Sequence, residues 1–137
     1  FPLIKYCPDD TFKNLKIDNF NNITCSEIYG RAIEGIIYLP LNKGNFSEQI
    51  NEVFIVHCLK TIESILQTTC YVNKAKILKK IRIYYSGKKN KLEIEKLIIK
   101  VLKQEVENIN MDLVNIEICD NFLKTIAGKN INYIIEN

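Results

Sequence analysis

The chain has 137 residues, 47% of them hydrophobic and 26% charged, which suits a single globular domain over residues 1–137. No apolar run approaches the ~18 residues that a membrane-spanning helix needs, so no membrane partner is expected. The net charge of +3 is too small to indicate nucleic-acid binding.

The chain begins at Phe1 and its only methionine is Met111, which predicts a domain excised from a longer chain.

The first third of the chain is predicted to contain strands. Residues 1–11 carry two prolines and are expected to form an irregular lead-in. Residues 23–29 and 32–39 are rich in β-branched and aromatic side chains, so we expect a strand in each.

The first helix is predicted over Phe46–Gln67. Asn45 and Glu48 have the spacing of a capping box, in which each side chain accepts a backbone N–H group at the helix start. The residues after the helix, Thr68–Asn73, are expected to form a loop. Apolar side chains recur near the 3.6-residue helical period at Phe46, Ile50, Val53, Phe54, Leu59, Ile62, Ile65 and Leu66.

A single strand, Ile77–Tyr85, is predicted between the two helices. Alternation along this strand places Ile81 and Ile83 on the face that meets the helices. The opposite face is expected to carry Leu78, Lys80, Arg82 and Tyr84.

A second capping box, formed by Asn90 and Glu93, starts the second predicted helix, Lys91–Glu107. This helix has a clean apolar stripe. Two more strands are predicted after it, over Leu113–Cys119 and Asn132–Glu136.

The predicted order of elements is strands, helix, strand, helix, strand, strand. A strand followed by a crossover helix returns parallel and right-handed. We therefore expect an α+β fold with one mixed β-sheet and both helices on one face. The other face would carry Tyr84, Leu78 and Leu113, and we expect an oligomer to bury it because exposed apolar patches are costly.

This layout, from about residue 20 to residue 137, resembles the RidA/YjgF family of reactive-intermediate deaminases, also called endoribonuclease L-PSP. Four segments carry the resemblance by their order and spacing. They are Gly35-Ile36-Ile37-Tyr38, the helix with Gln49, Leu59, Ile62, Ile65 and Leu66, the strand Ile81-Arg82-Ile83-Tyr84, and the strand Val114-Asn115-Ile116-Glu117-Ile118.

The resemblance implies a chorismate-mutase-like fold, a homotrimer and a cytoplasmic location. Family deaminases hold the substrate carboxylate with an Arg at the start of the later strand, where this chain has Asp112-Leu113-Val114. The chain is also similar to the divergent RidA-like modules of eukaryotic diphthine–ammonia ligases. The first expectation is therefore a ligand-binding or regulatory module of a diphthamide-synthesis ATP-pyrophosphatase, with no cofactor of its own.

Two alternatives stay open. One is a free-standing enamine or imine deaminase with a rebuilt site that uses Arg82. The other is an RNA-associated protein, suggested by the basic stretch that runs from Lys74 to Lys91.

The candidate ligand-binding residues are Arg82, Tyr84, Asn115 and Glu117, which the predicted strands place on the same sheet face. Together they could hold a small anionic or amino-acid-like ligand in a cleft between subunits. The resemblance adds Glu136, a further carboxylate near the position where the family often has one. No catalytic residue is assigned.

The five cysteines are Cys7, Cys25, Cys58, Cys70 and Cys119, and no pair has C-x-x-C spacing, so free thiols are predicted. No metal site is expected because the chain has one histidine. That histidine, His57, neighbours Cys58 on the predicted helix, where adjacent side chains diverge. A packed His57 is expected rather than a catalytic one.

Overall fold

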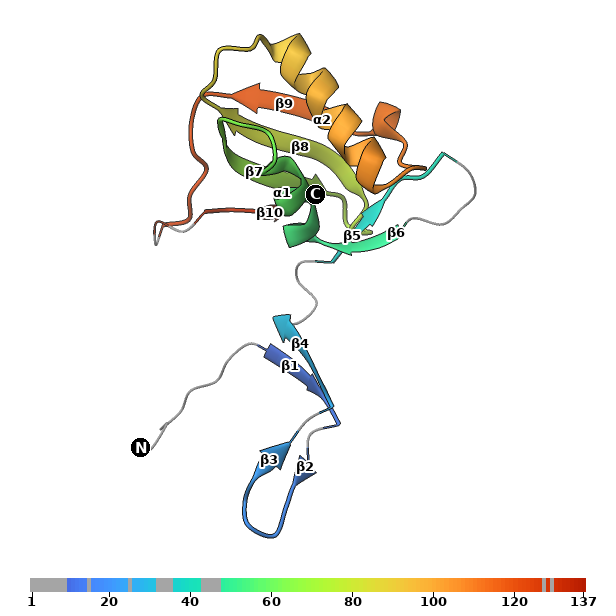
Figure 1. Ribbon diagram of the computed structural model, residues 1–137, viewed down its shortest axis with the longest axis vertical. Helices are drawn as coiled ribbons and strands as arrows, with labels where there is room; N and C mark the ends of the chain where they lie inside the picture. Colours follow the sequence, from blue (N-terminus) through green and yellow to red (C-terminus); the bar gives the residue numbers. More distant parts are fainter. Residues whose placement is uncertain are drawn as a thin grey trace. The chain divides into compact units, whose positions relative to one another are not determined.

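The computed structural model describes residues 10–14, 16–24, 26–31, 36–42, 48–126, 128 and 130–137. The chain divides into two compact units, Phe1–Gly35 and Ile36–Asn137 (Figure 1). The prediction of one domain does not anticipate this division. Most of the lead-in, Cys7, Cys25 and Asn45 lie outside the described residues.

The first unit consists of antiparallel strand pairs. Strand β1 (Asp10–Lys13) pairs with β4 (Glu27–Arg31), and β2 (Lys16–Ile17) pairs with β3 (Ile23–Thr24). The strand predicted over residues 23–29 is thus two strands, β3 and β4, with different partners.

The turn between β2 and β3 is organised by Asp18. Its carboxylate accepts hydrogen bonds from the backbone N–H groups of Phe20 and Asn22 and from the Asn22 side-chain amide, each at 2.8 Å. Asn21 adopts a left-handed φ of 64°, a conformation that asparagine tolerates well. The hydrogen bonds from Asn22, followed by the one from Phe20, hold the pKa of Asp18 below its ordinary value.

The second unit contains a four-stranded sheet in the order β10-β7-β8-β9. Its strands are β7 (Ile65–Val72), β8 (Leu78–Tyr85), β9 (Asn115–Cys119) and β10 (Tyr133–Ile135). Strand β8 is antiparallel to β7 and parallel to β9, and β10 is parallel to β7. The predicted α+β class with a mixed sheet is therefore confirmed.

A short hairpin precedes this sheet in the chain. Strands β5 (Ile36–Leu39) and β6 (Glu48–Asn51) are antiparallel, and a bridge from Tyr38 to Ile77 connects the hairpin to the start of β8. Helix α1 (Glu52–Leu59) follows β6 directly and is capped by the Asn51 side chain, which accepts the N–H of Val53.

The helix predicted over Phe46–Gln67 is wrong at both ends. Residues Glu48–Asn51 form β6, and the helix stops at Leu59. Ser64 has a φ of 70°, which interrupts a right-handed helix. The run Ile65–Val72 then contains the β-branched and aromatic residues that favour a strand.

Two strands, β7 and β8, consequently lie between the helices, so the prediction of a single strand there is wrong. The loop predicted over Thr68–Asn73 is wrong for the same reason, because residues 68–72 belong to β7. The layout argument for the RidA/YjgF resemblance required one strand at this point. The family resemblance loses that support and stays a prediction.

The later elements follow the prediction closely. Helix α2 (Lys91–Glu105) begins with the expected capping box, in which Asn90 and Glu93 each accept the other's backbone N–H. Residues Met111–Leu113 form a 3₁₀ turn before β9, so Leu113 is not part of the strand that was predicted to include it.

Both helices pack on the same face of the sheet, as predicted. Helix α1 contacts α2 and β7, and residues of both helices share one hydrophobic core (Figure 1). The sheet contributes Cys70, Val72, Ile81 and Ile83 to this core, and the helices contribute Ile55, Leu59, Ile94, Ile98 and Leu102.

Leu78 also belongs to this core, although alternation predicted it on the opposite face. A register shift between Tyr71 and Val72 pairs Val72 with Leu78 and Tyr71 with Lys80, so Lys79 is an extra residue on β8. The bulge turns Leu78 inward, where it is fully buried, and Lys79 outward.

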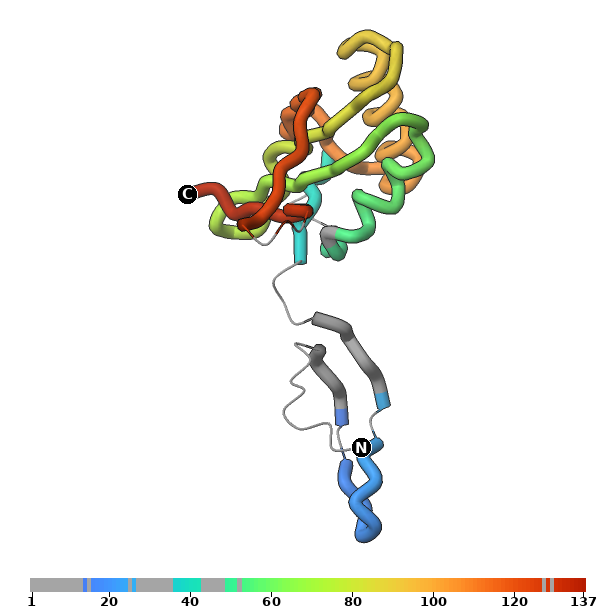
Figure 2. Tube along the Cα trace, turned by 90° about the vertical axis from the view of Figure 1, so that its left-hand side faces the viewer, coloured from blue at the N-terminus to red at the C-terminus, as the bar shows by residue number. Residues whose placement is uncertain are grey.

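The second face of the sheet is crossed by residues 120–131 (Figure 2). We call this segment the strap; residues 127 and 129 of it lie outside the described residues. Gln67 clamps the strap by donating to the Leu123 carbonyl at 2.6 Å and accepting the Leu123 N–H at 2.7 Å. Thr69 donates to the carbonyl of Ile131. The chain itself therefore covers part of the face that was predicted to need an oligomer.

Candidate functional site

The four candidate ligand-binding residues lie on the second face of the sheet. The β8–β9 register pairs Arg82 with Glu117 and Lys80 with Asn115, and Tyr84 lies one alternation beyond Arg82. The structure thus brings these side chains to one surface, as the predicted strands required. Whether they bind a ligand stays a prediction.

Arg82 lies beneath the strap and is only 7% exposed. Its Nη2 donates to the backbone carbonyl of Asn121 at 3.1 Å and to the side-chain oxygen of Asn121 at 2.9 Å. Its Nη1 is buried and has no hydrogen-bond partner among the described residues. Next to it, the Tyr84 and Phe122 rings pack edge to face, with their centroids 4.6 Å apart. In this conformation Arg82 and Tyr84 hold the strap.

Glu117 takes part in a charge network centred on Lys80. The Lys80 Nζ lies 3.2 Å from Glu136, 3.7 Å from Glu117 and 3.9 Å from the centre of the Tyr71 ring. Burial lowers the pKa of Lys80, but the hydrogen bond to Glu136 and both carboxylate charges outweigh it, so the pKa is raised. This network pairs one ammonium group with two carboxylates, so it leaves an excess of negative charge rather than a free cation for an anionic ligand.

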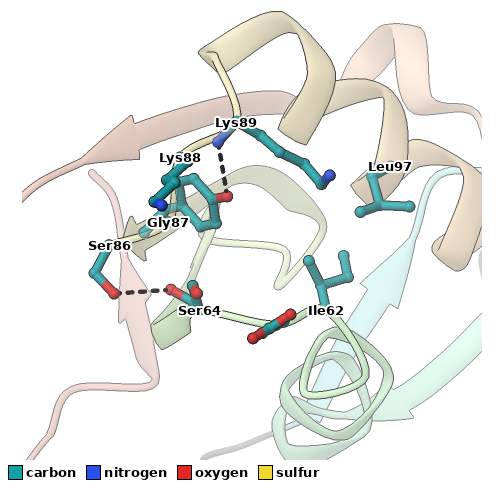
Figure 3. Close-up of a pocket in the computed structure, with 9 residues that line it drawn as sticks. Ile62, Ser64, Ser86, Gly87, Lys88, Lys89 and Leu97 are labelled. Carbon is teal, nitrogen blue, oxygen red and sulfur yellow. Dashed lines mark hydrogen bonds between the residues drawn. The ribbon is translucent and has the colours of Figure 1, made fainter.

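A hollow lies at the carboxyl end of β8, between the turn after α1 and the loop that leads into α2. Its volume is about 390 Å³, and we call it the terminal pocket (Figure 3). Ile62 and Leu97 form its apolar part. Its polar lining comes from Glu63, Ser64, Ser86, Lys88 and Lys89.

Hydrogen bonds fix the polar rim of the terminal pocket. The Ser86 backbone N–H donates to the Ser64 carbonyl at 3.0 Å, and its hydroxyl lies 3.5 Å from the same oxygen. The Lys89 backbone N–H donates to the Tyr85 hydroxyl at 3.2 Å. The turn after α1 and the loop after β8 are therefore joined, and the lysine side chains extend from a constrained loop (Figure 3).

Tyr85 separates the terminal pocket from a second hollow of about 320 Å³. Tyr85 and Lys89 line both hollows, and the second is completed by Lys91, Cys119 and Asp120. The Tyr85 ring and hydroxyl occupy the space where a side chain on Gly87 would begin. Only glycine fits at residue 87 while the Tyr85 ring keeps this position.

The charged side chains of the terminal pocket form no ion pairs among the described residues. Over the described part of the chain, neither Lys88 nor Lys89 has a carboxylate within 4.0 Å, and Glu63 has no basic partner within that distance. The pocket also lies at the carboxyl end of β8, where the chain leaves the sheet. The arrangement suits a small charged molecule.

His57 and Cys58 do not form a reactive pair at this pocket. His57 is exposed on α1, so the prediction that it is packed is wrong. Burial, followed by the charge of Glu105, raises the pKa of the Cys58 thiol, which disfavours the nucleophilic thiolate. Cys58 and Cys119 are free thiols, as predicted for these two.

Searches of the described residues find no group of three His, Cys, Asp or Glu side chains placed to hold a metal ion. Neither described helix has the length and apolar character needed to cross a membrane.

Sequence reasoning missed the terminal pocket for an identifiable reason. The predicted helix Phe46–Gln67 includes Glu63 and Ser64, and Lys88 and Lys89 lie in the basic stretch from Lys74 to Lys91. The available signal was Ser86-Gly87, a turn pair located between a strand and a helix cap.

No protein-family model matches the chain, and a search of curated proteins finds no significant match.

Proposed function

We propose that this chain is a binding module for a small ligand that carries an anionic group, which the terminal pocket holds. The observation that carries the proposal is the pair Lys88 and Lys89, which line a hollow of about 390 Å³ without a carboxylate partner in ion-pair distance. The hydroxyls of Ser64 and Ser86 add hydrogen-bonding groups at the same rim.

Binding rather than catalysis fits the residues of this pocket. Among the described residues, neither the Ser64 nor the Ser86 hydroxyl is hydrogen-bonded to Lys88, Lys89 or Glu63, so no nucleophile there is paired with a base. Its volume is at the small end for ligand sites. Ammonium and hydroxyl groups around an apolar floor fix the orientation of a small molecule, which is the task of a sensing or regulatory module.

The proposal is tested by titrating the ¹⁵N-labelled chain with acetate and with inorganic phosphate. Saturable shifts should appear at the amides of residues 86–90 and be lost in the double variant K88Q/K89Q. The matched control is K96Q/K103Q, which removes two exposed lysines that lie on α2 and do not line the pocket. Uniform, non-saturating shifts in all three chains would contradict the proposal.

The family-level form of this proposal is a RidA-like ligand-binding or regulatory module of a cytoplasmic diphthamide-synthesis ligase. It no longer has the support of the predicted layout, because two strands, β7 and β8, lie between the helices. A coding region that places an ATP-pyrophosphatase domain upstream of Phe1 would support it. The proposed homotrimer is tested by sedimentation equilibrium, where a monomer mass at all concentrations would exclude it.

The two other sequence-based hypotheses gain no support from the geometry. A deaminase built on Arg82 would need its guanidinium at an accessible site, whereas Arg82 is bonded to Asn121 beneath the strap. Imine hydrolysis that disappears in Arg82→Ala would reinstate the deaminase. RNA binding that falls steeply with salt would reinstate the RNA-associated protein.

A further inference from the structure

The terminal pocket combines charges of both signs with an apolar floor. Lys88 and Lys89 enter it from the loop after β8, and Glu63 enters from the turn after α1. Figure 3 shows the Lys89 side chain extending toward Leu97 and Ile62, so its ammonium group lies over the apolar part of the hollow. Ile62 is itself buried in the core, which makes that floor a fixed surface.

This combination discriminates between ligand classes. A simple anion could pair with the lysines, but it would share the hollow with the unpaired Glu63 carboxylate, and like charges at short range repel. A simple cation would meet Glu63 and two unpaired ammonium groups. A molecule that carries one group of each sign satisfies both sides, and an attached aliphatic chain would cover Ile62 and Leu97.

We propose that the ligand is a free α-amino acid with an aliphatic side chain. Its carboxylate pairs with Lys89, its ammonium group pairs with Glu63, and its side chain packs on Ile62 and Leu97. This inference rests on the proposed binding function of the same pocket and assigns the ligand's chemical class.

Tyr85 lines one wall of this site. Its side chain lines both the terminal pocket and the second hollow, and its hydroxyl accepts the Lys89 N–H at 3.2 Å. A single amino acid suits a hollow of about 390 Å³.

The test compares three ligands of matched carbon skeleton on the full chain by calorimetry. L-leucine carries both charged groups, 4-methylpentanoate lacks the ammonium group, and isopentylamine lacks the carboxylate. We expect L-leucine to bind about tenfold more tightly than either of the other two, because it forms both ion pairs and each of the others forms only one.

Variants identify the groups that recognise each end of the ligand. Glu63→Gln should weaken L-leucine about tenfold and leave 4-methylpentanoate unchanged or tighter, since the carboxylate that repels it is gone. Lys89→Gln should weaken both. Lys96→Gln, on the exposed surface of α2, is the control and should change neither. Thermal melting confirms that each variant is folded.

The outcomes separate the two proposals. If 4-methylpentanoate or acetate binds at the pocket and L-leucine binds no more tightly, the amino-acid inference is wrong and the anion-binding function stands. If L-leucine, 4-methylpentanoate, acetate and phosphate all fail to bind, both are wrong. The three-ligand comparison on the unaltered chain decides the inference even where a variant is unstable.

Discussion

Gly87 shows how one residue shapes the candidate site. The Tyr85 ring lies over its backbone so closely that any Cβ at residue 87 would overlap the ring carbons and the hydroxyl. The hydroxyl in turn accepts the Lys89 N–H. The glycine, the ring and the lysine loop therefore depend on one another, and the partition between the two hollows depends on all three.

Gly87→Ala should displace the Tyr85 ring and destabilise the chain by about 1–3 kcal/mol, the usual cost of forcing atoms into a packed site. Urea unfolding measures the loss. In a Tyr85→Ala background the same substitution should cost clearly less, because the overlapping ring is gone. Equal costs in the two backgrounds would show that the ring does not constrain residue 87.

Asp18 makes the β2–β3 turn sensitive to pH. Its folded pKa lies below the ordinary value of 3.8, so ionised Asp18 stabilises the turn fully above that value. The contribution is lost as the pH falls through the lowered folded pKa. Amide shifts of Phe20 and Asn22 should therefore stay constant near neutral pH and move together in acid. Asp18→Asn should abolish this step, and an unchanged acid step in that variant would exclude Asp18 as its cause.

At the scale of elements, the strap decides what the second face of the sheet can do. It follows β9 and crosses β8 and β7, where Arg82 and Gln67 bind it. The chain then enters β10, which pairs with β7. Both the N–H and the carbonyl of Leu123 are satisfied by one side chain, Gln67. A buried glutamine that supplies two backbone partners is a strong anchor, since leaving those groups unpaired is costly.

Gln67→Ala should release the strap and cost about 1–3 kcal/mol. Hydrogen exchange at the Leu123 amide should accelerate far more than exchange in α2. The exposed Gln104→Ala is the matched control and should be nearly neutral. Retained protection of Leu123 in Gln67→Ala would show that Arg82 and Tyr84 hold the strap without the clamp.

At the scale of the molecule, the described hydrophobic core belongs to one unit. All of its buried members lie between Ile37 and Val114, inside the unit Ile36–Asn137. The first unit consists of paired strands, and such two-stranded ribbons gain little independent stability in water. The stability of the fold should therefore reside in the second unit.

A chain shortened to residues 36–137 should fold by itself. Its thermal unfolding should be cooperative, with a midpoint within about 4 °C of the full chain, because a shift of that size corresponds to about 1 kcal/mol in a domain of this length. Circular dichroism follows the transition. A broad, non-cooperative melt of residues 36–137 would show that the first unit supplies essential contacts.

Local signals were enough to predict α2, β8, β9 and β10. The Asn90–Glu93 box and the apolar stripe of α2 are properties of neighbouring residues, and alternation in β8 correctly placed Ile81 and Ile83 in the core. Where periodicity was ambiguous the prediction was wrong. Ile62 and Ile65 fit a helix and a strand alike, and the positive φ of Ser64 that separates the two is set by the tertiary fold.

The sequence by itself determined the α+β class and the parallel return of β9 beside β8, because capping, periodicity and the handedness of a crossover helix are local properties. Only the tertiary structure decided that two strands separate the helices, that a bulge turns Leu78 inward and that the strap covers Arg82. The terminal pocket, too, was decided only by the tertiary structure. Glu63 and Lys89 are 26 positions apart in the chain, and only strand pairing between β7 and β8 brings them to one hollow.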